Sequence, residues 1–69
     1  MSGLVKRSVS LSGHATSLAL EPEFWAVLET IAAREGISLA AVIGRVDKGR
    51  GGSGLASACR VAALKARTA

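Results

Sequence analysis

The sequence predicts a small α+β fold, mostly helical, in which one or two strands precede three helices. Residues 5–20 alternate apolar and polar side chains in two short runs, as half-buried strands do. Residues 22–47 instead place apolar side chains at helical spacing, with an interruption at Gly36. An alanine-rich stretch follows a glycine-rich loop. With 69 residues, the chain is expected to form a single domain, 1–69.

The first alternating run, residues 5–12, is followed by Gly13-His14 and a second run at 15–20. A two-residue turn with glycine first predicts a type II′ hairpin, with Ser12 opposite Ala15. In that register the apolar sets of both strands share one face and the polar sets share the other. The alternative is that residues 5–13 form a flexible basic arm and only 15–20 is a strand.

The first helix is predicted at 22–35, because Pro22 suits a first helical position and Gly36 suits a left-handed cap. Its expected apolar stripe comprises Phe24, Leu28, Ile31 and Ala32, with Trp25 flanking.

Ser38 is expected to cap a second helix, 38–47. A loop at 48–54 contains four glycines and separates it from a third helix at 55–66. The small apolar side of the third helix is expected to comprise Leu55, Ala58, Cys59, Ala62 and Ala66.

A strand at 16–20 and two helices cannot enclose a core alone if the strand has no partner. A core of this size supplies about 3–5 kcal/mol, and a single cysteine and a single histidine exclude an internal disulfide and a Cys/His zinc cluster. A second copy is therefore expected to complete the fold. The expected dimer core is Leu18, Leu20, Phe24, Leu28, Ile31, Leu39, Val42, Ile43 and Val46.

The net charge of +4 points to an anionic partner. Residues 37–69 hold six basic residues against one acidic residue, whereas 21–36 hold one basic against four acidic. No apolar run approaches the ~18 residues of a membrane helix, and residues 1–13 do not resemble a secretory signal. The protein is expected to be cytoplasmic, without a membrane partner. No residue pair suggests catalysis, so no enzyme activity, cofactor or metal is expected.

The segment 16–46, TSLALEPEFWAVLETIAAREGISLAAVIGRV, resembles the ribbon-helix-helix superfamily of the Arc and MetJ repressors. The preceding residues and the third helix resemble a short bacterial subgroup that extends this core. The resemblance implies a homodimer in which strands of two protomers pair as an intermolecular antiparallel β-ribbon. In that superfamily the ribbon enters the DNA major groove, which admits a two-stranded ribbon.

The resemblance also suggests which residues contact double-stranded DNA. Since Leu18 and Leu20 face inward, the alternate positions face the bases; with the hairpin included, these are Lys6, Ser8, Ser10, Ala15, Ser17 and Ala19. The start of the second helix, with its free N–H groups, is expected to hold a phosphate. The expected phosphate contacts are Arg7, Ser38, Leu39, Lys48 and Arg50.

The function predicted is a sequence-specific DNA-binding transcriptional regulator, a repressor that acts as a dimer. One alternative is an antitoxin whose third helix binds a partner protein. The other is an adaptor of the same fold that does not bind DNA, because Ala15 and Ala19 are small for base contacts.

Overall fold

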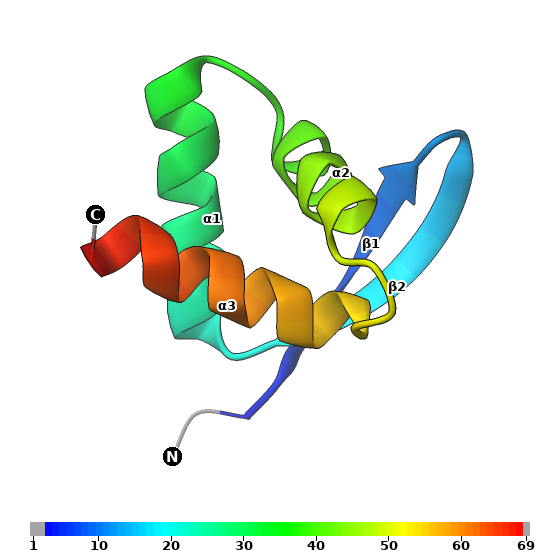
Figure 1. The fold of residues 1–69 in the computed structure, drawn as a ribbon, viewed down its shortest axis with the longest axis horizontal. Helices are drawn as coiled ribbons and strands as arrows, with labels where there is room; N and C mark the ends of the chain where they lie inside the picture. Colours follow the sequence, from blue (N-terminus) through cyan, green and yellow to red (C-terminus); the bar gives the residue numbers. More distant parts are fainter. Residues whose placement is uncertain (1–2, 69) are drawn as a thin grey trace.

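The computed structural model describes residues 3–68, in which a β-hairpin precedes three helices (Figure 1). Strand β1 spans Val5–Leu11 and β2 spans His14–Leu20. Helix α1 is Pro22–Glu35, α2 is Leu39–Gly49 and α3 is Leu55–Thr68. The α+β architecture, the N-terminal hairpin and the additional C-terminal helix are confirmed.

The hairpin has a different turn from the one expected. Leu11 pairs with His14, so the two turn residues are Ser12 and Gly13, with φ of 51° and 81°. Two positive φ values are typical of a type I′ turn, whose twist matches that of the strands. The prediction of a type II′ turn with Ser12 opposite Ala15 is wrong. The register moves by two residues, which leaves every side chain on its predicted face because the side-chain period of a strand is two.

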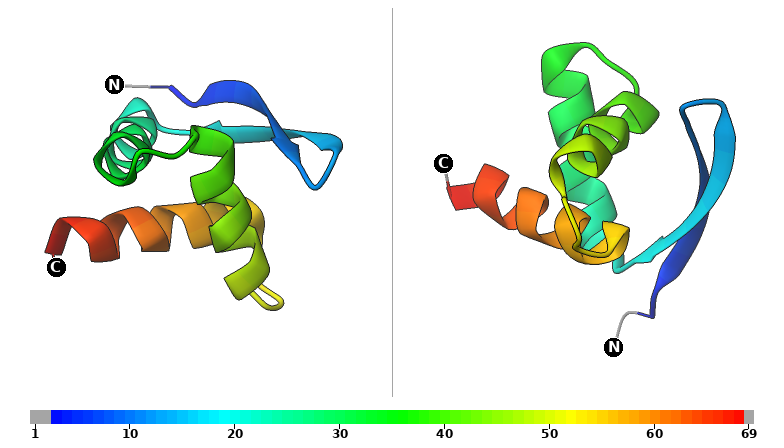
Figure 2. Two further views of the ribbon diagram at one scale, coloured as in Figure 1. Left: turned by 90° about the horizontal axis from the view of Figure 1, so that it is seen from above. Right: turned by 45° about the vertical axis from the view of Figure 1, so that its right-hand side comes forward.

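Each strand rests on a different helix: β1 packs against α2, and β2 packs against α3. The far end of β1 lies over Gly44, where an added Cβ would be 3.9 Å from Leu11 Cδ2. The hairpin runs along one side of the helices, and its tip projects beyond them (Figure 2).

The link between α1 and α2 has the predicted caps. Gly36 has φ of 68° and ends α1, and the N–H of Ile37 donates to the Ala32 carbonyl at 3.0 Å. Ser38 Oγ accepts from the N–H of Ala41 at 3.0 Å and caps α2. The second helix continues to Gly49, two residues beyond the predicted boundary, so Lys48 lies on a helix rather than in the loop.

The core lies between the hairpin and the three helices. Its largest fully buried side chains are Trp25, Leu20, Leu28, Ile43 and Cys59.

Two expectations about helical faces are corrected. Trp25 is only 1% exposed, whereas Phe24 is half-buried, so Trp25 is a core residue and Phe24 flanks it. In α3, Ala63 is buried beside Cys59, although it was not expected on the apolar side.

The premise that the second strand lacks a partner is also wrong, because β1 pairs with β2 along its whole length. With α3 added, one chain encloses its own core. Five of the nine residues expected at a dimer core are buried within the single chain, while four are half-buried and packed at its margin. The buried ones are Leu18, Leu20, Leu28, Val42 and Ile43, and the half-buried ones are Phe24, Ile31, Leu39 and Val46.

Candidate nucleic-acid interface

The six residues expected to face DNA bases form one continuous face of the hairpin. They pair directly across the two strands: Lys6 with Ala19, Ser8 with Ser17, and Ser10 with Ala15. Five of the six side chains are exposed and Ala19 is half-buried. We refer to these six residues as the outer face.

The opposite face of the hairpin packs onto the helices. Val9 is 6% exposed, Leu18 is 4% and Leu20 is fully buried. The alternation therefore separates a packed side from a solvent-facing side, and the latter carries only serine hydroxyls, alanine methyl groups and the ammonium of Lys6. A hydroxyl can hydrogen-bond a base edge, and an alanine methyl can contact the methyl group of thymine.

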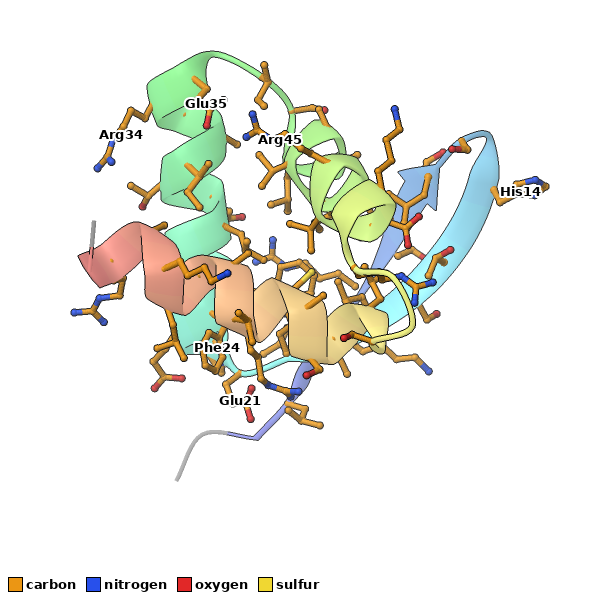
Figure 3. The ribbon with its side chains drawn as sticks, in the orientation of Figure 1. His14, Glu21, Phe24, Arg34, Glu35 and Arg45 are labelled. Atoms are coloured by element: carbon orange, nitrogen blue, oxygen red, sulfur yellow. The ribbon has the colours of Figure 1, made fainter. Side chains whose placement is uncertain are left out.

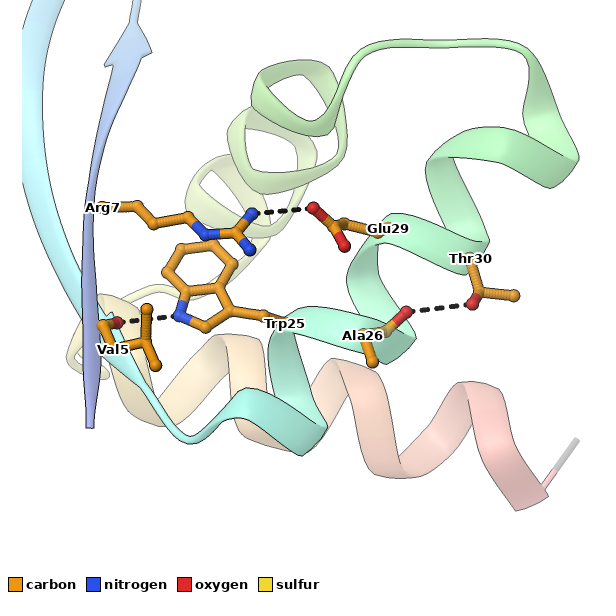
Figure 4. A network of polar contacts seen from close by, with 6 residues as sticks. All are labelled: Val5, Arg7, Trp25, Ala26, Glu29 and Thr30. Atoms are coloured by element: carbon orange, nitrogen blue, oxygen red, sulfur yellow. Dashed lines mark hydrogen bonds and ion pairs between the residues drawn. The ribbon is translucent and has the colours of Figure 1, made fainter. Parts of the chain in front are cut away.

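Three contacts hold the edge of β1 to α1 (Figure 4). They involve Trp25 on α1 and Arg7 on β1, whose side chains lie against each other. The indole Nε1–H of Trp25 donates to the Val5 carbonyl at 2.8 Å. The Arg7 guanidinium lies 4.7 Å from the Trp25 ring centroid, a cation–π distance, and its Nη1 is 2.7 Å from Glu29 Oε2. This arrangement fixes β1 on the body of its own chain.

Arg7 was expected to reach a phosphate from the hairpin edge. Its guanidinium instead points back over Trp25 to Glu29, on the packed side of the hairpin (Figure 4). Sequence reasoning missed this role, although two signals were present: an arginine at an inward position of the strand, and Trp25 and Glu29 four residues apart on one helix face.

The start of α2 has the geometry expected of a phosphate-binding helix end. The Ser38 hydroxyl is taken by the N–H of Ala41, so the cap itself is satisfied. The N–H groups of Leu39 and Ala40 belong to the first turn, where a helix has no internal acceptors. They add to the positive end of the helix dipole.

Lys48 and Arg50, which were predicted as phosphate contacts, differ in their surroundings. Lys48 is exposed on the last turn of α2. Arg50 instead hydrogen-bonds to residues close to it in the sequence. Its Nε donates to Asp47 Oδ1 at 2.6 Å, and its Nη1 donates to the Ser53 carbonyl. The guanidinium of Arg50 therefore closes the glycine-rich loop against the end of α2.

Two further ion pairs join elements and lower the pKa of their acids. Arg45 makes a bidentate contact with Glu35, both bonds at 2.9 Å, and this hydrogen bonding lowers the pKa of the Glu35 carboxyl (Figure 3). Arg60 Nε lies 2.9 Å from Glu21 Oε1 and likewise lowers the pKa of Glu21. Arginine side chains thus hold carboxylates on α1, on α2 and in the link that precedes α1.

The described part of the chain shows no sign of a metal centre or membrane span. Residues 3–68 contain no group of three or more histidine, cysteine or acidic side chains placed to hold a metal ion. None of their helices is both long and apolar enough to cross a bilayer. Cys59 is fully buried, and desolvation raises the pKa of its thiol, which disfavours the reactive thiolate. His14 lies at the projecting hairpin tip (Figure 3).

A solvent-facing two-stranded ribbon followed by two capped helices defines a class of small regulatory domains. The ribbon-helix-helix domain family matches residues 4–66, so the chain belongs to this family. Domains of this kind are typical of DNA-binding regulators and antitoxins rather than enzymes. Among curated proteins no match was found.

A similar solved structure is that of an uncharacterized protein from Bordetella pertussis Tohama I, with 37% sequence identity and a TM-score of 0.80. The match covers 96% of this chain and 57% of that one, so the chain spans little more than half of its neighbour.

Proposed function

We propose that this protein is a sequence-specific DNA-binding transcriptional regulator that acts in the cytoplasm as a homodimer and represses its target. The outer face supports this proposal most directly, because it presents six side chains on one side of a ribbon whose other side is packed. A two-stranded ribbon is about 5 Å wide between strand axes, and the major groove is about 12 Å wide. The hairpin therefore fits the groove with its side chains directed at the base edges.

Phosphate contacts supply much of the affinity in this proposal. The N–H groups of Leu39 and Ala40 open α2, and Lys48 is exposed at the end of the same helix. Arg7 and Arg50 are proposed as secondary phosphate contacts, because each must exchange an acidic partner, Glu29 or Asp47, for a phosphate. A net charge of +4 per chain adds a general attraction to DNA.

The outer face has limited capacity for direct base discrimination. A bidentate contact is worth about 1–3 kcal/mol; among the outer-face residues only Lys6 is of a type that makes one, with guanine, and neither serine nor alanine does. We infer that specificity arises from several single hydrogen bonds, thymine methyl contacts and the close approach that a flat face permits.

Selection of bound duplexes from a random pool tests the proposal, followed by fluorescence anisotropy of the selected site at about 50 and 200 mM salt. We expect a recurrent site, with affinity that falls steeply with salt. Lys6→Glu should weaken binding at least tenfold at the lower salt concentration. Lys65→Glu is a control of equal charge change on α3, and it should have a smaller effect. Failure to enrich any site, or equal effects of the two reversals on a site that is enriched, would contradict this function.

An antitoxin role is the second candidate, and α3 is the feature that favours it. Val61 is 47% exposed and Leu64 is 55% exposed on this helix, so two large apolar side chains three residues apart face solvent on the same side of the helix. Co-purification of one specific protein with the wild type, lost with Val61→Asp, would support this role. An adaptor that does not bind DNA is the third reading. It is supported by the small side chains of Ala15 and Ala19, and a failed selection would favour it.

A further inference from the structure

We propose that a hollow between α1 and the C-terminal end of α3 binds a small organic oxyanion, a carboxylate or phosphate group carried on a short apolar body. Helix α1 contributes Thr30, Arg34 and three apolar side chains to this hollow, and α3 contributes Ala66 and Arg67. We refer to the space that they line as the arginine hollow. The proposal goes beyond the proposed function, because it concerns a different surface and needs no DNA.

The two arginines without a carboxylate partner lie at the same place. The chain has six arginines, and four of them pair with carboxylates at 2.6–2.9 Å: Arg7, Arg45, Arg50 and Arg60. Within residues 3–68 the other two, Arg34 and Arg67, have no acidic partner. Both are exposed and both line the arginine hollow. The hollow therefore carries two positive charges that the chain does not neutralise.

The helix dipoles explain each arginine separately but not their position at one hollow. Arg34 lies in the last turn of α1 and Arg67 lies in the last turn of α3, where a cation is favoured. Two guanidinium groups at one site repel each other, and no acidic residue of the described chain lines the hollow to offset them. A bound anion removes this repulsion. A planar guanidinium also binds a carboxylate or a phosphate through two parallel hydrogen bonds.

The size and the lining of the arginine hollow fit a small organic molecule. Its volume is about 400 Å³, within the range of about 300–1,000 Å³ that is typical of small-molecule sites. The three apolar side chains from α1 are those of Ala26, Val27 and Ile31. The Thr30 hydroxyl already donates to the Ala26 carbonyl at 2.9 Å, so towards a ligand it can only accept (Figure 4). The arginines therefore bind the anionic group, and the apolar wall contacts the body of the ligand.

The arginine hollow lies away from the surface proposed to contact DNA. Helix α1 and the C-terminal end of α3 lie at one side of the molecule, and the hairpin tip lies at the other (Figure 1, Figure 2). Arg34 and His14 accordingly lie on opposite sides (Figure 3). A ligand in the arginine hollow leaves the outer face open, so ligand binding and DNA binding can be measured independently.

NMR titration of the full chain, observed at its backbone amides, tests the proposal. The probes are phenyl phosphate and benzoate, at about 0.15 M salt to screen exposed charges. Inorganic phosphate has the charge without the body, and benzyl alcohol has the body without the charge. We expect saturable shifts at Thr30, Arg34 and Ala66. The tighter of the two anionic probes should bind at least ~fivefold more tightly than inorganic phosphate, because its ring buries apolar surface. Preference for phenyl phosphate would indicate a phosphate ligand, and preference for benzoate a carboxylate.

Two charge variants and a matched control test the role of the arginines. Arg34→Gln and Arg67→Gln should each weaken the tighter probe at least ~tenfold, because each removes charge-assisted hydrogen bonds. Both side chains are exposed, so these variants should fold. Lys48→Gln removes the same charge from an exposed residue that does not line the hollow. It should change the affinity by less than about twofold at this salt concentration.

Ala26→Leu separates a shaped site from general attraction between charges. Ala26 is exposed, and leucine is a good helix former, so the fold should be retained while the hollow is partly filled. The tighter probe should lose at least ~fivefold in affinity, while inorganic phosphate should stay within about twofold.

Several results would overturn the inference. They are saturation by benzyl alcohol, inorganic phosphate that binds as tightly as the ring-bearing anions, an unchanged affinity in Ala26→Leu, and equal losses in Lys48→Gln and Arg34→Gln. Absence of saturable binding, as expected if a second copy covers this part of α1, would also overturn it. Since no DNA is present, none of these results bears on the proposed function, which the selection of duplexes tests separately.

Discussion

Trp25→Phe should destabilise the protein strongly, because Trp25 connects β1 to α1. The substitution keeps an aromatic ring but removes the N–H that donates to the Val5 carbonyl at 2.8 Å. Losing that hydrogen bond costs about 1 kcal/mol. The smaller ring also leaves a cavity where a side chain was 1% exposed, which adds about 1–2 kcal/mol. The expected total is about 2–3 kcal/mol, roughly half the stability of a domain of this size.

Urea unfolding followed by far-UV circular dichroism measures this effect. Circular dichroism is needed because Trp25 is the only tryptophan, so its fluorescence disappears with the substitution. With a slope near 1 kcal/mol per molar urea, the midpoint should fall by about 2–3 M. Glu29→Gln is the control, because it breaks only the ion pair with Arg7. The Arg7 side chain is 40% exposed and that of Glu29 is 53% exposed, so the midpoint should shift by less than about 1 M. A shift below about 0.5 M for Trp25→Phe, at unchanged slope, would refute this account of how β1 is held.

Three further effects are expected. Gly36→Ala should lower the free energy of unfolding by about 1–2 kcal/mol, because Gly36 has φ of 68°, which alanine adopts only with strain. Tm should fall by several degrees in a thermal melt. An unchanged Tm would show that the backbone at the end of α1 adapts to alanine without strain. The carboxyl groups of Glu21 and Glu35 have a pKa in the folded protein below the ordinary value of 4.5. Their ion pairs therefore stabilise the fold fully above pH 4.5, and this stabilisation is lost as the pH falls through the folded pKa. Tm should decline over that pH range, and it should decline less in Arg45→Gln, which lacks the partner of Glu35. Cys59 should react with an aromatic disulfide reagent only on unfolding, and rapid reaction in native buffer would contradict its burial.

Much of the hairpin could be predicted from the sequence because the side-chain period of a strand is two. The six residues of the outer face follow from that period alone. They stay on the same face although the register differs by two residues from the predicted one, because two is the side-chain period. The turn type did not follow, since Ser12-Gly13 and Gly13-His14 both place a glycine where a positive φ is wanted. Both turn types match the twist of paired strands, so the turn residues alone do not choose between them. The choice follows from pairing along the whole hairpin, which closes at Leu11 and His14.

The contacts of Trp25 and Arg7 depend on tertiary placement, and local patterns could not supply them. Phe24 and Trp25 are neighbours about 100° apart on α1, so the helix period alone does not decide which one faces the core. The position of β1 decides it, because the Val5 carbonyl lies where the indole can reach it. Arg7 likewise meets Glu29 across 22 residues of sequence. The homodimer and the DNA contacts remain predictions from family resemblance and surface chemistry.

The outer face has a consequence for how this protein can change. The side chains of the outer face pack little against the rest of the protein, because the core lies on the opposite face of the same two strands. Exchanging residues there should alter what the protein recognises while leaving its folding almost untouched. A combinatorial library at these six codons should therefore yield mostly folded variants, and new preferences could evolve through single changes without passing through an unstable intermediate.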